Sequence, residues 1–207
     1  MNRINELFSR KRHDILSLYF CAGSPTLEGT ATVIKTLEQK GIDMIEIGIP
    51  FSDPMADGVV IQNAATQALR NGMTLRKLFD QLKEIRQEVS IPLILMGYLN
   101  PIMQYGFDNF CRSCQNCGID GVIIPDLPFK DYVEEFRPIA ERYDLRIIML
   151  ITPETSEARV REIDQHTDGS STWFLPLLQP EFKPISMKKG KHISAVSRIC
   201  SYVIHAW

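Results

Sequence analysis

Several features that mark other protein classes are scarce or absent in this chain of 207 residues. No apolar run approaches the roughly 18 residues needed to cross a bilayer, and the first six residues are polar, unlike a signal peptide. The net charge of −2 gives no electrostatic reason to expect binding to nucleic acid or to an anionic membrane. With 44% hydrophobic residues the chain can form one sizeable core. We therefore expect a cytoplasmic protein.

Cysteine is also scarce, and five is an odd number, unlike the disulfide framework of a small secreted protein. Cys111, Cys114 and Cys117 form C-x2-C-x2-C, but the C-x3-C-P continuation typical of an iron–sulfur site is missing. Together with Phe107 and Phe110 they recur at steps of three and four residues, which is typical of the buried face of a helix. We predict buried thiols and no metal site.

Strand-like and helix-like segments alternate through most of the chain. Each strand-like segment is almost uninterruptedly apolar, which indicates a parallel sheet covered by helices. No Gly-x-Gly-x-x-Gly follows the first strand, which weighs against a dinucleotide-binding fold. The pattern alone does not distinguish an open, doubly wound sheet from a closed barrel. The predicted strands are 15–21, 43–49, 92–96, 121–124 and 146–151, and the predicted helices are 26–40, 59–70, 75–88, 107–117, 130–143 and 154–165.

One segment places a carboxylate inside an apolar strand. Glu46 lies in the middle of the second predicted strand, where an unpartnered carboxylate would be costly. The following loop, 50–58, contains two Pro, two Asp, one Ser and one Gly, a composition typical of a rigid loop. Glu46 and Asp57 would then face one cavity, as an acid or base with a shifted pKa requires. A buried Glu bound by backbone donors beside an ordinary turn is the alternative, and the residues alone favour neither.

The same segment resembles a family signature. E-x-G-x-P-F-S-D-P-x-A-D-G, at 46–58, is similar to the hallmark of the tryptophan synthase alpha subunit family. The resemblance covers residues 1 to about 169 and implies a (β/α)8 barrel, of which about the first five βα units are present. Segments that carry it further are 19–25, 61–64, 72–74, 96–101, 118–121 and 125–128.

The resemblance implies a lyase of tryptophan biosynthesis. Its reaction is the retro-aldol cleavage of indole-3-glycerol phosphate to indole and glyceraldehyde 3-phosphate, with no metal or organic cofactor. Glu46 matches the family's catalytic Glu, which is suited to proton transfer, and Asp57 matches the catalytic Asp, which accepts the indole N–H. Four further residues match positions of the indole pocket, although ordinary core packing explains them as well: Tyr19, Tyr98, Pro125 and Leu150.

The resemblance also implies a partner, the pyridoxal-phosphate-carrying beta subunit, in an alpha2-beta2 assembly. Pro50 and Asp53 would lie on that contact. Other barrel chemistries are disfavoured, because strands two to five carry no Lys for a Schiff base and the His residues are too dispersed for a metal site. A different interpretation is a non-catalytic fragment that only binds the beta subunit.

Residues 170–207 differ in character from the rest. They hold five basic residues and one acid, a charge of +4, so residues 1–169 carry −6. The family expects a sixth strand here and then a loop resembling S-S-x-x-T-T-G. When the codons of residues 170–180 are regrouped one base earlier, the genetic code permits Phe-Ile-Tyr-Met-Val-Ser-Ser-Ala-Ser-Thr-Thr-Gly.

We therefore expect residues 1–169 to be the N-terminal part of one barrel and residues 170–207 to be out-of-frame translation after the loss of one base near Gly169. The chain would then be inactive, because the loops that grip the substrate phosphate follow strands six to eight. A divergent natural C-terminal segment is the alternative.

The nucleotide sequence tests this expectation. Restoring one base near codon 169 should open a frame that encodes the Ser-Ser-Ala-Ser-Thr-Thr-Gly segment and continues without a stop. Codons for residues 170–180 that cannot encode this segment in the shifted frame would refute the frameshift.

Overall fold

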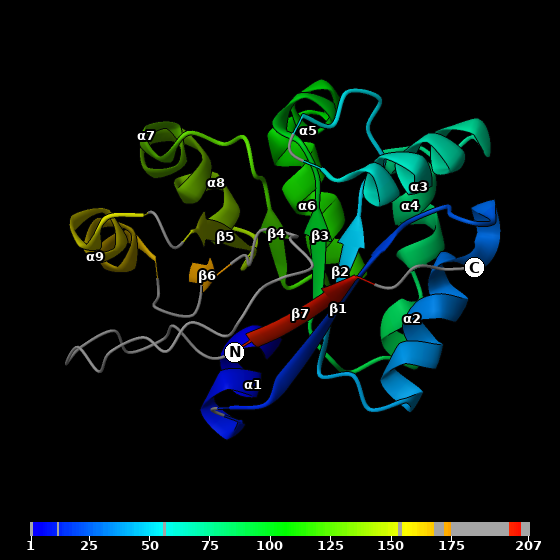
Figure 1. Ribbon diagram of the computed structural model, residues 1–207, viewed down its shortest axis with the longest axis horizontal. Coiled ribbons are helices and arrows are strands. Elements are labelled where there is room, and N and C mark those ends of the chain that lie inside the picture. The colour runs from blue at the N-terminus through cyan, green and yellow to red at the C-terminus, as the bar shows by residue number, and fades with distance from the viewer. Residues whose placement is uncertain are drawn as a thin grey trace.

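The computed structural model describes residues 2–11, 13–55, 57–152 and 155–167, and the backbone of two strands at 172–174 and 199–203. Its centre is a sheet in which every strand pair is parallel, in the order β6-β5-β4-β3-β2-β1-β7 (Figure 1). This arrangement and the helices around it confirm the predicted fold of consecutive βα units. The strands are β1 Ile15–Cys21, β2 Met44–Gly48, β3 Leu93–Met96, β4 Gly121–Ile123, β5 Arg146–Ile151, β6 Thr172–Phe174 and β7 Ile199–Val203.

Two strands are additional to the five predicted from the sequence. β6 pairs with β5, with Trp173 opposite Leu150, and β7 pairs with β1, with Ser201 opposite Ser17. The outer edges of β1 and β5 are therefore paired over part of their length. The sequence of β7, Ile-Cys-Ser-Tyr-Val, is rich in β-branched and aromatic residues that suit a strand. It escaped prediction because no helix-patterned segment accompanies it.

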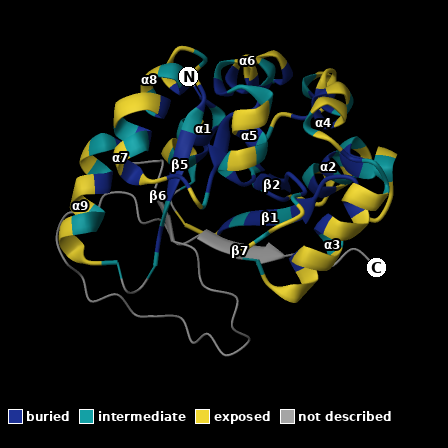
Figure 2. Cartoon of the chain, turned by 90° about the horizontal axis from the view of Figure 1, so that it is seen from above, coloured by how far each residue is buried: buried dark blue, intermediate teal, exposed yellow. Residues whose placement is uncertain are grey.

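Apart from the first helix, the helices form an outer layer around the sheet, with exposed residues on their outward sides (Figures 1 and 2). Short 3-10 or π turns extend some of them, so that the helix predicted at 130–143 is three consecutive elements, with a π turn at Tyr132–Phe136 between two short α-helices. The α-helices are α1 Arg3–Arg10, α2 Thr30–Gln39, α3 Val59–Arg70, α4 Leu75–Leu82, α5 Leu99–Tyr105, α6 Phe107–Cys117, α7 Phe129–Asp131, α8 Arg137–Glu141 and α9 Glu157–His166.

Helix α1 covers the inner face of the sheet near the amino ends of the strands. The Asn2 side chain caps it by accepting a hydrogen bond from the Ile4 amide at 3.0 Å, and the Asn2 amide group donates to the carbonyls of Asp120 and Asp144. Ile4 and Leu7 then pack into an inner apolar cluster. The other fully buried members of this cluster come one from each of the five central strands: Ile15, Met44, Ile94, Ile123 and Ile148.

A buried carboxylate ties these amino ends together. Asp120, 3% exposed, accepts hydrogen bonds from the Leu93 amide at 2.9 Å, from Arg86 at 2.5 Å and from Arg3 at 3.1 Å. Arg86 also donates to the carbonyl of Gly118. Burial lowers the pKa of the Arg86 guanidinium, and the charge of Asp120 opposes that shift. One cluster of ion pairs thus joins α1, β3 and the segment before β4.

The helix-face interpretation of the cysteines is confirmed. Cys111, Cys114 and Cys117 lie on the buried side of α6 with Phe107 and Phe110. Burial raises the pKa of the Cys111 thiol to about 12, so it is a poor nucleophile and a poor metal ligand in this state.

Among the described residues, no group of three or more His, Cys, Asp or Glu is placed to hold a metal ion. In the same part of the chain, no helix is long and apolar enough to cross a membrane.

Candidate active site

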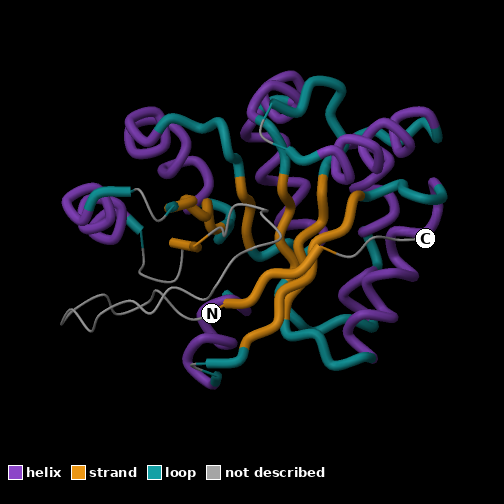
Figure 3. The backbone as a smooth tube through the Cα atoms, viewed as in Figure 1, coloured by secondary structure: helices purple, strands orange, loops and turns teal. Residues whose placement is uncertain are grey.

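The carboxyl ends of the central strands and the loops that follow them gather the two predicted catalytic carboxylates. In Figure 3 the loops after β2, β3 and β4 leave the sheet at the same end. The register places Glu46 of β2 between Tyr19 of β1 and Ile94 of β3. Paired residues of a parallel sheet point to the same face. Since Ile94 belongs to the inner apolar cluster, Glu46 and Tyr19 point to the inside as well.

Glu46 is buried, with 3% of its surface exposed, and it is hydrogen-bonded. The Ser17 hydroxyl donates to Glu46 Oε1 at 2.6 Å, and Ser17 is itself fully buried. The sequence left two explanations for Glu46 open: an acid or base facing a cavity, or a carboxylate bound by backbone donors. Neither included a side-chain donor on the neighbouring strand, which is what the structure has. Sequence reasoning missed Ser17, although a Ser two residues before Tyr19 inside an apolar strand indicates an inward-facing hydroxyl.

Asp57 lies between β2 and α3 and is half-buried. Burial raises the pKa of its carboxyl group, and a hydrogen bond with the Tyr98 side chain opposes that shift. Tyr98 directly precedes α5, and its ring centroid lies 5.4 Å from that of Phe51 in the loop after β2. The loops after β2 and β3 therefore meet at the Asp57 carboxylate.

Tyr19 joins the two carboxylates into one site. Burial raises the pKa of its phenol well above the ordinary value, and the nearby charges of Cys21, Asp57 and Glu46 raise it further. The strand register places Glu46 directly beside Tyr19, and the charge of Asp57 acts on the same phenol. The hydroxyl rests against Gly48, so that a Cβ on Gly48 would overlap it. The Gly of the E-x-G sequence is therefore required for the Tyr19 ring to cross the strand.

The remaining predicted residues lie at the same end of the sheet or line the inner face. Pro125 is half-buried in the turn after β4, and Leu150 on β5 packs against the inner apolar cluster. Of the two predicted contact residues, Pro50 is buried, whereas Asp53 is exposed. The Leu99 amide donates to the Asp126 carboxylate at 2.8 Å, which joins the loops after β3 and β4.

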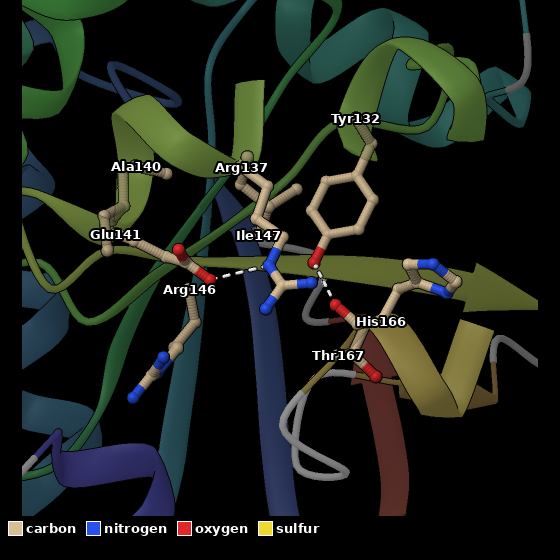
Figure 4. Close-up of a pocket in the computed structure, with 9 residues that line it drawn as sticks. Tyr132, Arg137, Ala140, Glu141, Arg146, Ile147, His166 and Thr167 are labelled. Atoms are coloured by element: carbon tan, nitrogen blue, oxygen red, sulfur yellow. Dashed lines mark hydrogen bonds and ion pairs between the residues drawn. The ribbon is translucent and has the colours of Figure 1, made fainter. Parts of the chain in front are cut away.

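A surface depression of about 270 Å³ lies elsewhere, beside α8, β5 and the end of α9 (Figure 4). Two of its polar side chains have hydrogen-bond partners within the depression: Arg137 donates to Glu141 at 2.6 Å, and the Tyr132 hydroxyl donates to the backbone carbonyl of His166 at 3.1 Å. None of its lining residues is a predicted site residue. The chemistry argued from Glu46 and Asp57 therefore does not use this depression.

Comparison with known proteins shows the family of this chain. The family model described as tryptophan synthase alpha chain matches residues 5–172. The chain belongs to this family.

The tryptophan synthase alpha chain of Bacteroides fragilis is 78% identical over 169 residues, which are 82% of this chain and 64% of that protein. The Phocaeicola vulgatus protein is also 78% identical, over 82% of this chain and 66% of its own length. The crystal structure of tryptophan synthase subunit alpha from Legionella pneumophila is similar with a TM-score of 0.78 and 37% identity, covering 86% of this chain and 69% of that one. This chain therefore spans about two thirds of the length of its relatives.

The contact between Tyr19 and Gly48 makes a testable prediction. Gly48→Ser should destabilise the 207-residue chain by about 1–3 kcal/mol, because the added atoms overlap the Tyr19 ring in a packed interior. Gly58→Ser is the matched control, since a Cβ at Gly58 meets no atom within 4 Å. Urea unfolding measures both variants.

Adding Tyr19→Leu to the Gly48→Ser chain should recover part of the lost stability by removing the ring. Equal unfolding midpoints for Gly48→Ser and Gly58→Ser would show that Tyr19 does not occupy this position.

Proposed function

We propose that the intact protein is a tryptophan synthase alpha chain that cleaves indole-3-glycerol phosphate to indole and glyceraldehyde 3-phosphate in the cytoplasm. The observation that carries this proposal is the buried Glu46 beside Tyr19 on neighbouring strands, with the half-buried Asp57 in the loop that follows β2. Family membership supports the same reaction. The alternative, a fragment that only binds the beta subunit, has no observation of its own in its favour.

The site residues divide the proposed reaction between them. Glu46 protonates C3 of the indole ring and takes the proton from the glycerol hydroxyl, so that the carbon–carbon bond breaks and an aldehyde forms. Asp57 accepts a hydrogen bond from the indole N–H and stabilises the positive charge that develops on the ring. Tyr19, Tyr98, Pro125 and Leu150 would enclose the indole. The reaction so described uses protein side chains alone and needs no cofactor; pyridoxal phosphate would belong to the beta subunit.

The domain assignment of residues 170–207 is also a proposal. The family match ends at residue 172, and the alignment with Bacteroides fragilis spans 169 residues, near the point where the regrouped codons begin to resemble the family. We infer that residues 1–169 are the N-terminal part of a barrel and that residues 170–207 are out-of-frame translation. A chain translated from the gene with the missing base restored is called here the frame-restored chain.

The two carboxylates give the sharpest test of the reaction. In the frame-restored chain, Glu46→Gln or Asp57→Asn should lower indole formation at least about 100-fold, because general acid–base groups and charge-stabilising groups each contribute about that much. The variants keep side-chain size, so circular dichroism should be unchanged. Indole release is followed by absorbance or colorimetry.

The 207-residue chain should release no measurable indole in the same assay. Near-normal turnover by a Glu46→Gln or Asp57→Asn variant would remove that residue from the mechanism, and indole formation by the 207-residue chain would refute the frameshift assignment.

The beta subunit is the proposed partner, and the loop after β2 is the proposed contact, with Pro50 buried in its base and Asp53 presented at its surface. Met55 of this loop is 95% exposed, and Val59 at the start of α3 and Met103 on α5 are also exposed. Exposed apolar side chains beside a charge are typical of a protein interface.

Asp53→Lys in the frame-restored chain should weaken co-purification with a tagged beta chain at least about tenfold, because it reverses a charge within the contact. Glu84→Lys makes the same charge change on an exposed residue before the 3-10 turn at Ile85–Gln87 and should bind normally. Equal retention of both variants would place the contact elsewhere.

A further inference from the structure

The inner face of β1 carries one small polar side chain. Ile15, Ser17 and Tyr19 alternate onto this face, and Ser17 has no exposed surface. A buried hydroxyl without a hydrogen bond costs free energy, and an apolar side chain would avoid that cost. The Ser17 hydroxyl has a partner, since it lies 2.6 Å from Glu46 Oε1 and donates to it. The choice of Ser at this position is therefore explained by the carboxylate on the neighbouring strand.

The strand register shows from which side Ser17 approaches Glu46. Tyr19 is opposite Glu46, and Ser17 is opposite Met44, two residues nearer the amino ends of the strands. Ser17 thus holds the carboxylate from the side that α1 and the inner apolar cluster close off. Tyr19 and the loop that carries Asp57 lie toward the carboxyl ends, the side from which substrates enter such barrels.

We propose that Ser17 is a positioning residue for Glu46. The Ser17 hydroxyl holds one oxygen of the Glu46 carboxylate from the amino-terminal side of the strands. It thereby sets the direction in which the carboxylate exchanges protons with the substrate. The kinetic consequence rests on the proposed function, whereas the hydrogen bond itself does not. A hydrogen bond to the ionised carboxylate also favours that form over the protonated acid.

Other groups near Glu46 act on it differently. Tyr19, beside Glu46 in the register, is itself acted on by Cys21 on β1, Asp57 after β2 and Tyr98 after β3. All four are either neutral or negative, so none of them stabilises the ionised form of Glu46 by opposite charge. Its register neighbour Ile94 on β3 is apolar. Because the Ser17 hydroxyl donates to Glu46 Oε1 and so favours the ionised form, its loss should raise the pKa of Glu46.

The test is a direct titration of Glu46 in the 207-residue chain. Glutamate labelled with ¹³C at the side-chain carboxyl reports each carboxyl pKa by NMR, and Glu46→Gln assigns the Glu46 resonance. Ser17→Ala should raise the Glu46 pKa by about one pH unit or more, as expected for the loss of a hydrogen bond to a charged group. Ser17→Thr keeps the hydroxyl and should restore the original value.

Thr30→Val is the matched control. The Thr30 hydroxyl is buried and has no hydrogen-bond partner within the described residues, so its removal should leave the Glu46 titration unchanged. Identical titrations of Glu46 in the wild-type chain and in the Ser17→Ala variant would overturn the proposal. If Ser17→Ala fails to fold, Ser17→Cys decides the question: a thiol donates weakly, so the pKa should rise by less, and an unchanged pKa refutes the role.

Kinetics of the frame-restored chain separate this inference from the proposed function. Ser17→Ala should shift the acidic limb of the pH profile of kcat to higher pH, by about the same interval as the rise in the Glu46 pKa. The KM for indole-3-glycerol phosphate should be nearly unchanged. Absence of indole formation by the frame-restored wild-type chain refutes the proposed function, and the NMR titration still decides the role of Ser17. An unmoved acidic limb in an active Ser17→Ala chain overturns the positioning role.

Discussion

The need to satisfy a carboxylate inside an apolar sheet governs the arrangement of this site. Glu46 is 3% exposed, and burial of an ionised group without partners would cost more than the margin by which domains are stable. The Ser17 hydroxyl meets this need from the neighbouring strand, and Gly48 leaves the space in which the Tyr19 ring crosses beside the carboxylate. The residues at three inward-facing positions of β1 and β2, Ser17, Tyr19 and Gly48, thus form the surroundings of the Glu46 carboxylate.

Two buried acids, Asp120 just before β4 and Glu46 in the middle of β2, are stabilised in different ways. Asp120, at the amino ends, is paired with the guanidinium groups of Arg86 and Arg3, which favour its ionised form and fix it in place. Glu46, further toward the carboxyl ends, accepts a hydrogen bond from a neutral hydroxyl. A carboxylate held by a neutral hydroxyl exchanges a proton more readily than one held by two guanidinium groups. This difference is consistent with a structural role for Asp120 and with the catalytic role proposed for Glu46.

The accuracy of the predicted elements followed the strength of their hydrophobic pattern. β1, β5, α3 and α6 have the predicted bounds because each carries a continuous apolar run or a clear helical face. α1 and α5 were not predicted. α1 has only two buried apolar residues among polar ones, and α5 contains Pro101, which is tolerated because it lies in the first helical turn. Both helices are stabilised by contacts with distant parts of the chain that local pattern does not record.

The sequence by itself determined the order of βα units, the buried cysteine face and the two carboxylates, because these depend on local periodicity and on a long contiguous motif. Tertiary structure decided what surrounds them. Ser17 and Glu46 are 29 residues apart, and Asn2 and Asp120 are 118 apart. Their pairing follows from strand register and from the packing of α1 against the strands. The positions of the strands at 172–174 and 199–203 were also decided by tertiary structure. Each pairs with an edge of the sheet, β5 or β1, whose backbone groups would otherwise have no strand partner.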